Sequence, residues 1–207
     1  MKTMTLCILA LGCLLIFGLT GNAQSSTQDD AAAPGDSSQY TRQLSSSDPL
    51  TRQSAAEALA RLAAVDQKKL VEGYALEEKD KRVRLALNWA LYRMGKSIML
   101  FPIVRDLDSP RHDQAADYLA QLEGPEPLYS FLRQDNTRAR VTTRLLEVLG
   151  RVGDAETLNQ IKPLNTSFDP RISEAAQTAT NMIQRRLDQP QQPVKTRPRV
   201  LGQKPDR

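Results

Sequence analysis

The chain has very little cysteine and histidine. It contains two cysteines, Cys7 and Cys13, and both lie in an apolar segment at the N-terminus. If that segment is removed, no thiol remains, which excludes disulfides, zinc-thiolate sites and cysteine nucleophiles. The one histidine, His112, leaves no material for a catalytic triad or for a metal site built from several histidines.

Aromatic residues make up only 5% of the chain, and no segment alternates β-branched and polar residues as a half-buried strand would. Alanine and leucine are plentiful, which favours packed helices over a sheet. The sequence also has no glycine-rich phosphate loop and no serine nucleophile elbow. We therefore expect no enzyme, and we predict no catalytic residue, cofactor or metal site.

Two clusters of polar residues are candidates for catalysis or metal binding. His112 with Asp113 could act in acid–base catalysis, but no nucleophile accompanies it, and we expect an ordinary surface or inter-repeat residue. Asp106, Asp108 and Asp113 do not have the spacing of a calcium-binding loop. We interpret Asp108 as a helix cap.

The net charge of +4 is not spread evenly. From Gln24 to Leu187 the 22 basic and 22 acidic residues cancel, whereas Asp188–Arg207 has five basic and two acidic residues. A balanced central region argues against a nucleic-acid groove.

The N-terminus resembles a secretory signal. Lys2 precedes an apolar run over Leu6–Leu19, and Gly21 and Ala23 place small residues where cleavage would occur. We predict a signal peptide over residues 1–23 and an exported protein, periplasmic or secreted, without an integral membrane span in the mature chain. The alternatives are a lipoprotein attached through Cys13 and an uncleaved N-terminal anchor.

Two segments lack any hydrophobic periodicity. Residues 24–36 are rich in serine, aspartate and alanine and are predicted to be a disordered linker. Residues 188–207 combine four prolines with basic residues and are predicted to be an extended, disordered tail. The tail is either a solubilising segment or a tether to an acidic lipid, an acidic envelope polymer or an acidic partner.

Between these segments, residues 37–187 repeat a helix–turn–helix pattern about every 30 residues. Each repeat has an aspartate in the turn before its second helix: Asp48, Asp80, Asp108, Asp135 and Asp169. Glycines that could end the second helices recur as Gly95, Gly124 and Gly153. Aligned apolar positions form columns, first Leu59, Leu91, Leu119, Leu149 and Ala179, and then Leu62, Met94, Leu122, Val152 and Met182. These start and stop signals predict about five stacked helix pairs.

The first repeat carries a family resemblance. Asp48-Pro49-x-x-Arg52, followed by Ala55-Ala-x-Ala-Leu and closing on Leu62, resembles the HEAT repeat, in the short form found in phycobilisome-lyase-like proteins. The resemblance implies an all-α fold, a right-handed α-solenoid with the second helices on the concave side, and protein binding as the usual role. It does not imply lyase chemistry.

The second repeat differs from the others on one face. Leu85, Trp89 and Tyr92 form a second apolar stripe on its second helix, and the positions aligned with Trp89 and Tyr92 in other repeats are mostly acidic or small. The acidic positions aligned with Trp89 are Glu57, Asp117 and Glu147, and a further column holds Arg61, Arg93 and Arg151. We predict that these nine residues bind a protein or peptide partner, with Trp89 as anchor and the arginines as rim. The alternative is that Leu85, Trp89 and Tyr92 pack between helices.

The sequence thus predicts an exported, non-catalytic scaffold that binds a partner on its second helices. Two alternatives are an envelope protein tethered through its basic tail and, with less support, a cofactor-handling protein related to lyases.

Overall fold

The computed structural model describes residues 37–133 and 138–189. The predicted signal peptide and linker, the turn at Asp135 and the tail from residue 190 onward lie outside the described residues. All of the described residues belong to one unit of the chain, residues 34–207.

Regular structure in the described residues is entirely helical, so the all-α prediction is confirmed. We call the first helix of each pair an A helix and the second a B helix. The A helices are α1 (Ser37–Gln43), α3 (Lys68–Glu77), α5 (Leu100–Asp106), α7 (Glu126–Leu132) and α9 (Ala155–Ile161). The B helices are α2 (Pro49–Leu62), α4 (Lys81–Arg93), α6 (His112–Leu119), α8 (Ala139–Val152) and α10 (Pro170–Asp188). Short 3₁₀ helices precede or follow A helices at Val65–Gln67, Ser97–Met99 and Lys162–Thr166.

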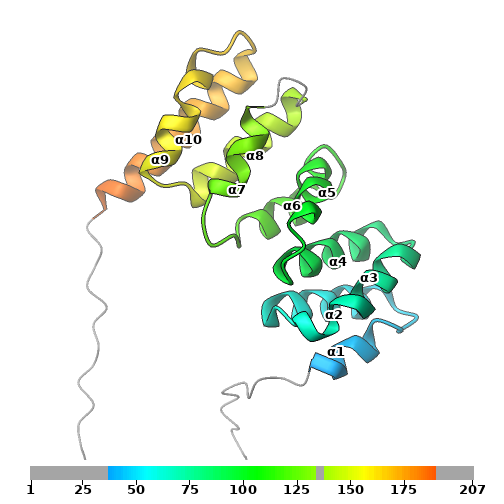
Figure 1. Cartoon of the computed structure of the whole chain (residues 1–207). Helices are drawn as coiled ribbons and strands as arrows, with labels where there is room; N and C mark the ends of the chain where they lie inside the picture. The colour runs from blue at the N-terminus through cyan, green and yellow to red at the C-terminus, as the bar shows by residue number, and fades with distance from the viewer. Residues whose placement is uncertain (1–36, 134–137, 190–207) are drawn as a thin grey trace, which may run out of the picture. The chain divides into compact units, whose positions relative to one another are not determined.

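The helices follow one another in space in their chain order (Figure 1). The most extensive packing joins successive B helices, α2 with α4 and α8 with α10, while each A helix packs on the B helix of its pair. This arrangement is what stacked helix pairs would produce. The right-handed solenoid stays a prediction.

The first predicted apolar column forms the core. Leu59, Leu91, Leu119, Leu149 and Ala179 are each at most 2% exposed. The second column is only partly correct, because Met94 is buried while Leu62 and Met182 are 42% and 41% exposed. Each position of the second column lies three residues after one of the first, which is a rotation of about 300° around the helix axis. The second column therefore lies at the edge of the buried stripe.

Three of the predicted aspartate caps are present. Asp48, Asp80 and Asp169 each accept hydrogen bonds from backbone N–H groups in the first turn of the helix that follows. The prediction for Asp108 is wrong. Helix α6 starts only at His112, and Asp108 instead lies within 2.7 Å of Arg138 and 3.3 Å of Arg140.

Of the three glycines predicted to end B helices, one adopts the left-handed conformation. Gly95 has a φ of +88° after α4, the left-handed conformation that glycine adopts without strain. Gly153 has a φ of −65°, and Gly124 is not among the described residues with positive φ. The left-handed residue after α2 is Ala63, with a φ of 45°.

Arginines connect successive pairs through long side chains. Arg52 of α2 donates two hydrogen bonds to Glu78, at 2.8 and 3.0 Å, beyond the end of α3. Arg186 of α10 donates to the backbone carbonyls of Gly150, Arg151 and Gly153, which close the C-terminal end of α8.

Within the described residues, no helix combines the length and apolar character that a bilayer crossing requires.

Candidate interaction surface

The nine predicted site residues all lie on B helices, but not all of them reach the surface. Leu85 and Trp89 of α4 are 1% and 3% exposed, and Tyr92 is half-buried. Trp89 and Leu85 therefore belong to the core, as the packing alternative predicts. With 3% of its surface exposed, Trp89 has almost no area with which to contact a partner. Its role in a binding surface is to support the more exposed residues that pack on it.

Trp89 is the centre of an aromatic stack across two B helices. Its ring lies 5.6 Å from that of Tyr92, with an interplanar angle of 15°, and 5.7 Å from that of Tyr118 on α6, with an angle of 4°. The guanidinium of Arg93 lies 5.8 Å from the Trp89 ring centroid, within the range of a cation–π contact. Trp89 therefore packs between two aromatic rings, whereas the aligned positions in three other repeats carry acids.

Above the stack, Tyr118 and Glu57 join α6 to α2. The Tyr118 hydroxyl donates to Glu57 Oε1 at 2.7 Å, and Gln53 Nε2 donates to the same oxygen at 2.9 Å. Gln114 Nε2 donates to the Tyr118 hydroxyl at 2.8 Å. Burial, reinforced by the hydrogen bond to Glu57, raises the pKa of the Tyr118 phenol well above its ordinary value.

These groups line a hollow of about 430 Å³, which we call the polar hollow. Three successive B helices contribute to it: α2, α4 and α6. Its lining residues are Gln53, Glu57, Arg61, Trp89, Gln114, Asp117, Tyr118 and Gln121. Four of the nine predicted site residues meet here, although the sequence placed them in three different repeats.

A second hollow of about 530 Å³ lies between α8 and α10 and contains two more predicted residues, Glu147 and Arg151. Arg151 also contacts Asp117 of the polar hollow, at 3.4 Å between Nη1 and Oδ1. The B helices thus carry two hollows joined by one exposed ion pair.

The i,i+4 spacing of Glu57 with Arg61, and of Glu147 with Arg151, predicts an ion pair within each helix, and this prediction is wrong. Among the described residues, neither Glu57 with Arg61 nor Glu147 with Arg151 comes within ion-pair distance. Glu57 is held by Tyr118 and Gln53, while Arg151 contacts Asp117 on the neighbouring B helix. Contacts between repeats therefore replace the pairing that spacing along one helix predicts.

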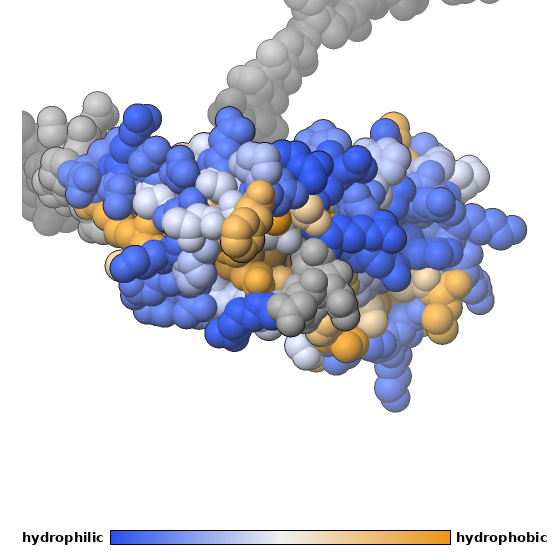
Figure 2. All heavy atoms as spheres, turned by 90° about the horizontal axis from the view of Figure 1, so that it is seen from above, coloured by the Kyte–Doolittle hydropathy of each residue, from blue (hydrophilic) through white to orange (hydrophobic). Residues whose placement is uncertain are grey.

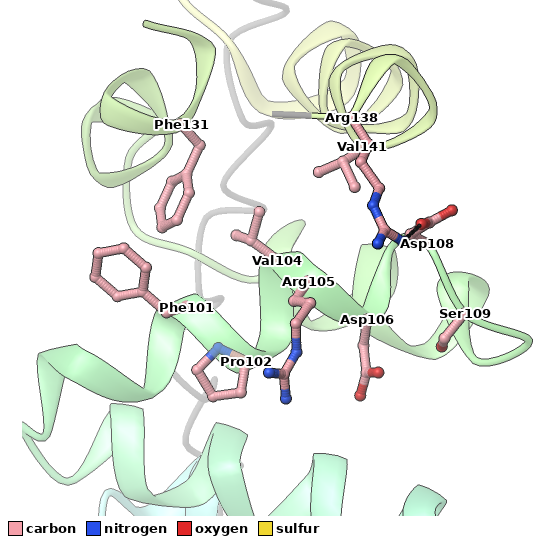
Figure 3. A pocket seen from close by; sticks show the side chains of 10 residues that line it. All are labelled: Phe101, Pro102, Val104, Arg105, Asp106, Asp108, Ser109, Phe131, Arg138 and Val141. Carbon is pink, nitrogen blue, oxygen red and sulfur yellow. Dashed lines mark hydrogen bonds and ion pairs between the residues drawn. The ribbon is translucent and has the colours of Figure 1, made fainter. Parts of the chain in front are cut away.

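The sequence interpretation missed a third hollow, which is larger than the two described above. This space of about 650 Å³ lies among α5, α7 and α8 (Figure 3). Phe101 and Phe131 face each other at one side, with ring centroids 5.0 Å apart, and Val104 and Val141 line the middle. Arg138 closes the opposite side through its ion pair with Asp108. Phe101 and Phe131, which lie on successive A helices, could have indicated this hollow. The A helices of the other repeats contain no phenylalanine, so the repeat pattern did not point to it.

Hydrophobic residues are otherwise dispersed over the surface. The face shown in Figure 2 is mostly hydrophilic, with separate small hydrophobic patches. The most exposed large hydrophobic residues in the described part of the chain, Phe168 and Leu76, come from different repeats.

His112 is half-exposed at the start of α6. Its ring lies 3.1 Å from the Ser109 carbonyl oxygen through Nδ1 and 3.3 Å from Asp113 Oδ1 through Nε2. These are contacts within a turn, and no serine hydroxyl among the described residues forms a hydrogen bond with the ring. Nor do three or more histidine, cysteine, aspartate or glutamate side chains in this part of the chain gather closely enough to hold a metal ion.

Comparisons with known proteins add no family. No protein-family model and no curated protein matches the chain. Among the solved structures that match, one is described as the crystal structure of an engineered protein. The match covers 73% of this chain and 80% of that one, with 20% identity and a TM-score of 0.35. At this TM-score the similarity carries no argument about fold or function, and the resemblance to HEAT repeats stays a prediction.

Proposed function

We propose that the protein is a non-catalytic scaffold that binds a peptide or protein segment along its B helices. The observation that carries this proposal is the polar hollow, to which α2, α4 and α6 each contribute side chains. A surface built from three repeats presents groups at fixed spacing to a long ligand, which is how repeat arrays are generally used.

The composition of this surface suits a ligand that carries amide and charged groups, as a peptide does. The polar hollow carries both signs of charge and three carboxamides, while its aromatic floor is buried. The exposed ion pair between Asp117 and Arg151 leads from it to the hollow between α8 and α10. A ligand that follows the B helices would meet polar groups over most of its length.

The experiment is a selection of displayed random peptides on the full chain, repeated on a surface variant that combines Arg61→Ala, Asp117→Ala and Glu147→Ala. All three side chains are exposed, so the variant should keep its fold. We expect the variant to lose at least tenfold in peptide enrichment, which corresponds to about 1.4 kcal/mol of binding free energy.

The matched control removes one base and two acids from A helices, through Lys69→Ala, Glu77→Ala and Glu126→Ala. It should enrich the same peptides as the unchanged chain. If no peptide is enriched on the unchanged chain, or if both variants lose enrichment equally, the B-helix surface is not the binding site.

The proposed location is the cell envelope or the exterior, because residues 1–23 resemble a signal peptide. Mass spectrometry of the native N-terminus tests it. A chain that begins at Gln24 supports export, and a chain that retains Met1 contradicts cleavage.

A further inference from the structure

Glu57 presents one carboxylate oxygen to the polar hollow. Both of its hydrogen bonds, from Tyr118 and Gln53, arrive at Oε1. Within the described residues, no donor reaches Oε2 and no cation pairs with the carboxylate. The side chain is therefore fixed in place by two donors while half of its acceptor capacity stays open to a ligand.

Arg61 offers the opposite charge on the same wall. It is exposed, lines the polar hollow, and has neither a hydrogen bond nor an ion pair among the residues that the structure describes. Asp117, the other acid of the hollow, already contacts Arg151. The two charges open to a ligand are thus Glu57 and Arg61.

The separation of these two residues has a counterpart in an extended peptide. Four residues along an α-helix advance about 6 Å. In an extended strand, residues i and i+2 lie on the same side and about 6.6 Å apart. A peptide in this conformation can place a basic side chain on Glu57 and an acidic one on Arg61, provided that one residue separates them.

The carboxamides of the hollow favour an extended chain over a helix. The Nε2 group of Gln53 is bonded to Glu57, that of Gln114 to Tyr118 and the Arg82 carbonyl, and that of Gln121 to the Asp117 carbonyl. Their Oε1 atoms accept no hydrogen bond within the described residues. Backbone N–H groups that need acceptors are present in an extended peptide, whereas a helix uses its own carbonyls.

We propose that the polar hollow binds an extended peptide with two opposite charges separated by one residue, the base at Glu57 and the acid at Arg61. The inference rests on the proposed function, since it specifies the ligand of the same surface. It adds a charge pattern and a backbone conformation that a general peptide-binding surface does not require.

The test is a competition among three displayed peptide libraries on the full chain. One library carries opposite charges at positions i and i+2, in both orders. The second carries them at adjacent positions, which point to opposite sides of a strand. The third carries like charges at i and i+2. We expect at least tenfold greater enrichment of the first library over the other two.

Charge variants of the protein make the test specific. Arg61→Glu should transfer the preference to peptides with two basic residues at i and i+2. Glu57→Gln keeps a carbonyl acceptor for Tyr118 and Gln53, and should remove the selection for the base but not for the acid. Lys69→Glu, on α3, is the control and should leave the preference unchanged. Circular dichroism at matched concentration checks that each variant is folded.

The outcomes separate the two proposals. Equal enrichment of the three libraries, together with loss of enrichment in the triple-alanine B-helix variant, overturns the charge pattern and leaves the proposed function standing. A preference that persists unchanged in Arg61→Glu also overturns the charge pattern. Failure of all three libraries to enrich overturns both proposals.

Discussion

The Tyr118 hydroxyl donates a 2.7 Å hydrogen bond to the carboxylate of Glu57, 61 residues earlier in the chain. The two residues belong to the first and third helix pairs, and the Trp89 ring of the second pair stacks against Tyr118. In most repeat arrays each unit contacts only its neighbours. Here a single bond spans three units, so it should contribute to stability and to the shape of the polar hollow together.

Tyr118→Phe removes this bond and keeps the ring. We expect the free energy of unfolding to fall by about 1.5 kcal/mol, the lower end of the range for a bond to a charged group, because Glu57 is half-buried. Urea unfolding measures the change. Tyr92→Phe is the control, because Tyr92 stacks on the same tryptophan but its hydroxyl has no hydrogen bond among the described residues. Equal losses in both variants would contradict the assigned role of the bond.

Stability should fall in alkaline solution because of the same phenol. Burial and the bond to Glu57 raise the pKa of Tyr118 in the folded state above the ordinary value near 10. The folded state then binds this proton more tightly than the unfolded state, so the contribution is complete below about pH 10 and is lost as the pH rises above it. Urea midpoints between pH 8 and pH 11.5 should decrease, and the decrease should be smaller in Tyr118→Phe. An identical decrease in both proteins would refute the assignment.

Arg52 and Glu78 form the most protected ion pair between helix pairs, with side chains 18% and 7% exposed. Arg52→Met leaves the carboxylate without its partner, and we expect a loss of about 2 kcal/mol at pH 7. The guanidinium lowers the pKa of Glu78, so the stabilisation is present above the ordinary value of 4.5 and is lost as the pH falls through the lowered pKa. The difference between the two proteins should therefore shrink at pH 2.

The control for this pair is Arg171→Met, because Arg171 and Asp169 form a more exposed pair at 72% and 26%. Exposed pairs contribute between about 0 and 1 kcal/mol, so the change should stay within about 1 kcal/mol. A larger loss in Arg171→Met than in Arg52→Met would reverse our ranking of the two ion pairs.

Trp89 is the only tryptophan in the chain, so its fluorescence reports one site. With 3% of the residue exposed, its emission should be blue-shifted and poorly quenched by acrylamide until the protein unfolds. Trp89→Ala should cost about 3–5 kcal/mol, because it leaves a cavity under Tyr92 and Tyr118. Red-shifted and readily quenched emission from the folded protein would place Trp89 at the surface instead.

Replacing Gly153 or Gly73 with alanine should change the stability of the protein in opposite directions. At Gly153 an added Cβ would lie 2.5 Å from the Leu149 carbonyl oxygen and 2.8 Å from Ile183 Cδ1, so we expect a loss of about 1–3 kcal/mol. At Gly73, inside α3, nothing lies within 4 Å. Gly73→Ala should gain about 0.5–1 kcal/mol from helix propensity. Thermal unfolding of the two variants compares them, and changes of the same sign would contradict the local packing described for one of them.

Features set by neighbouring residues could be predicted from the sequence. Asp48 and Asp169 precede prolines and cap the next helix through N–H groups only two or three residues away. The column of Leu59 and Leu149 is buried because one helical period places it on the inner face. These local rules were sufficient for the helix pairs and for the all-α class.

Features set by distant residues could not be predicted in this way. Asp108 resembles the other turn aspartates, yet Arg138 and Arg140 occupy its carboxylate from 30 or more residues away. The position of Trp89 depends on Tyr118, which sequence alignment within the repeats did not single out. The site residues were therefore placed on the correct helices, but the division between core and surface required the packing of α2, α4 and α6.

The side chain of Arg186 determines how far the C-terminus can be shortened. The last fully buried residue of α10 is Ile183, which suggests that the chain could be cut soon after it. Arg186, however, supplies donors to three carbonyl groups at the end of the preceding B helix. A truncation at residue 184 would remove these donors and leave the three carbonyls to water, so we expect a fragment that retains residue 186 to be the more stable one.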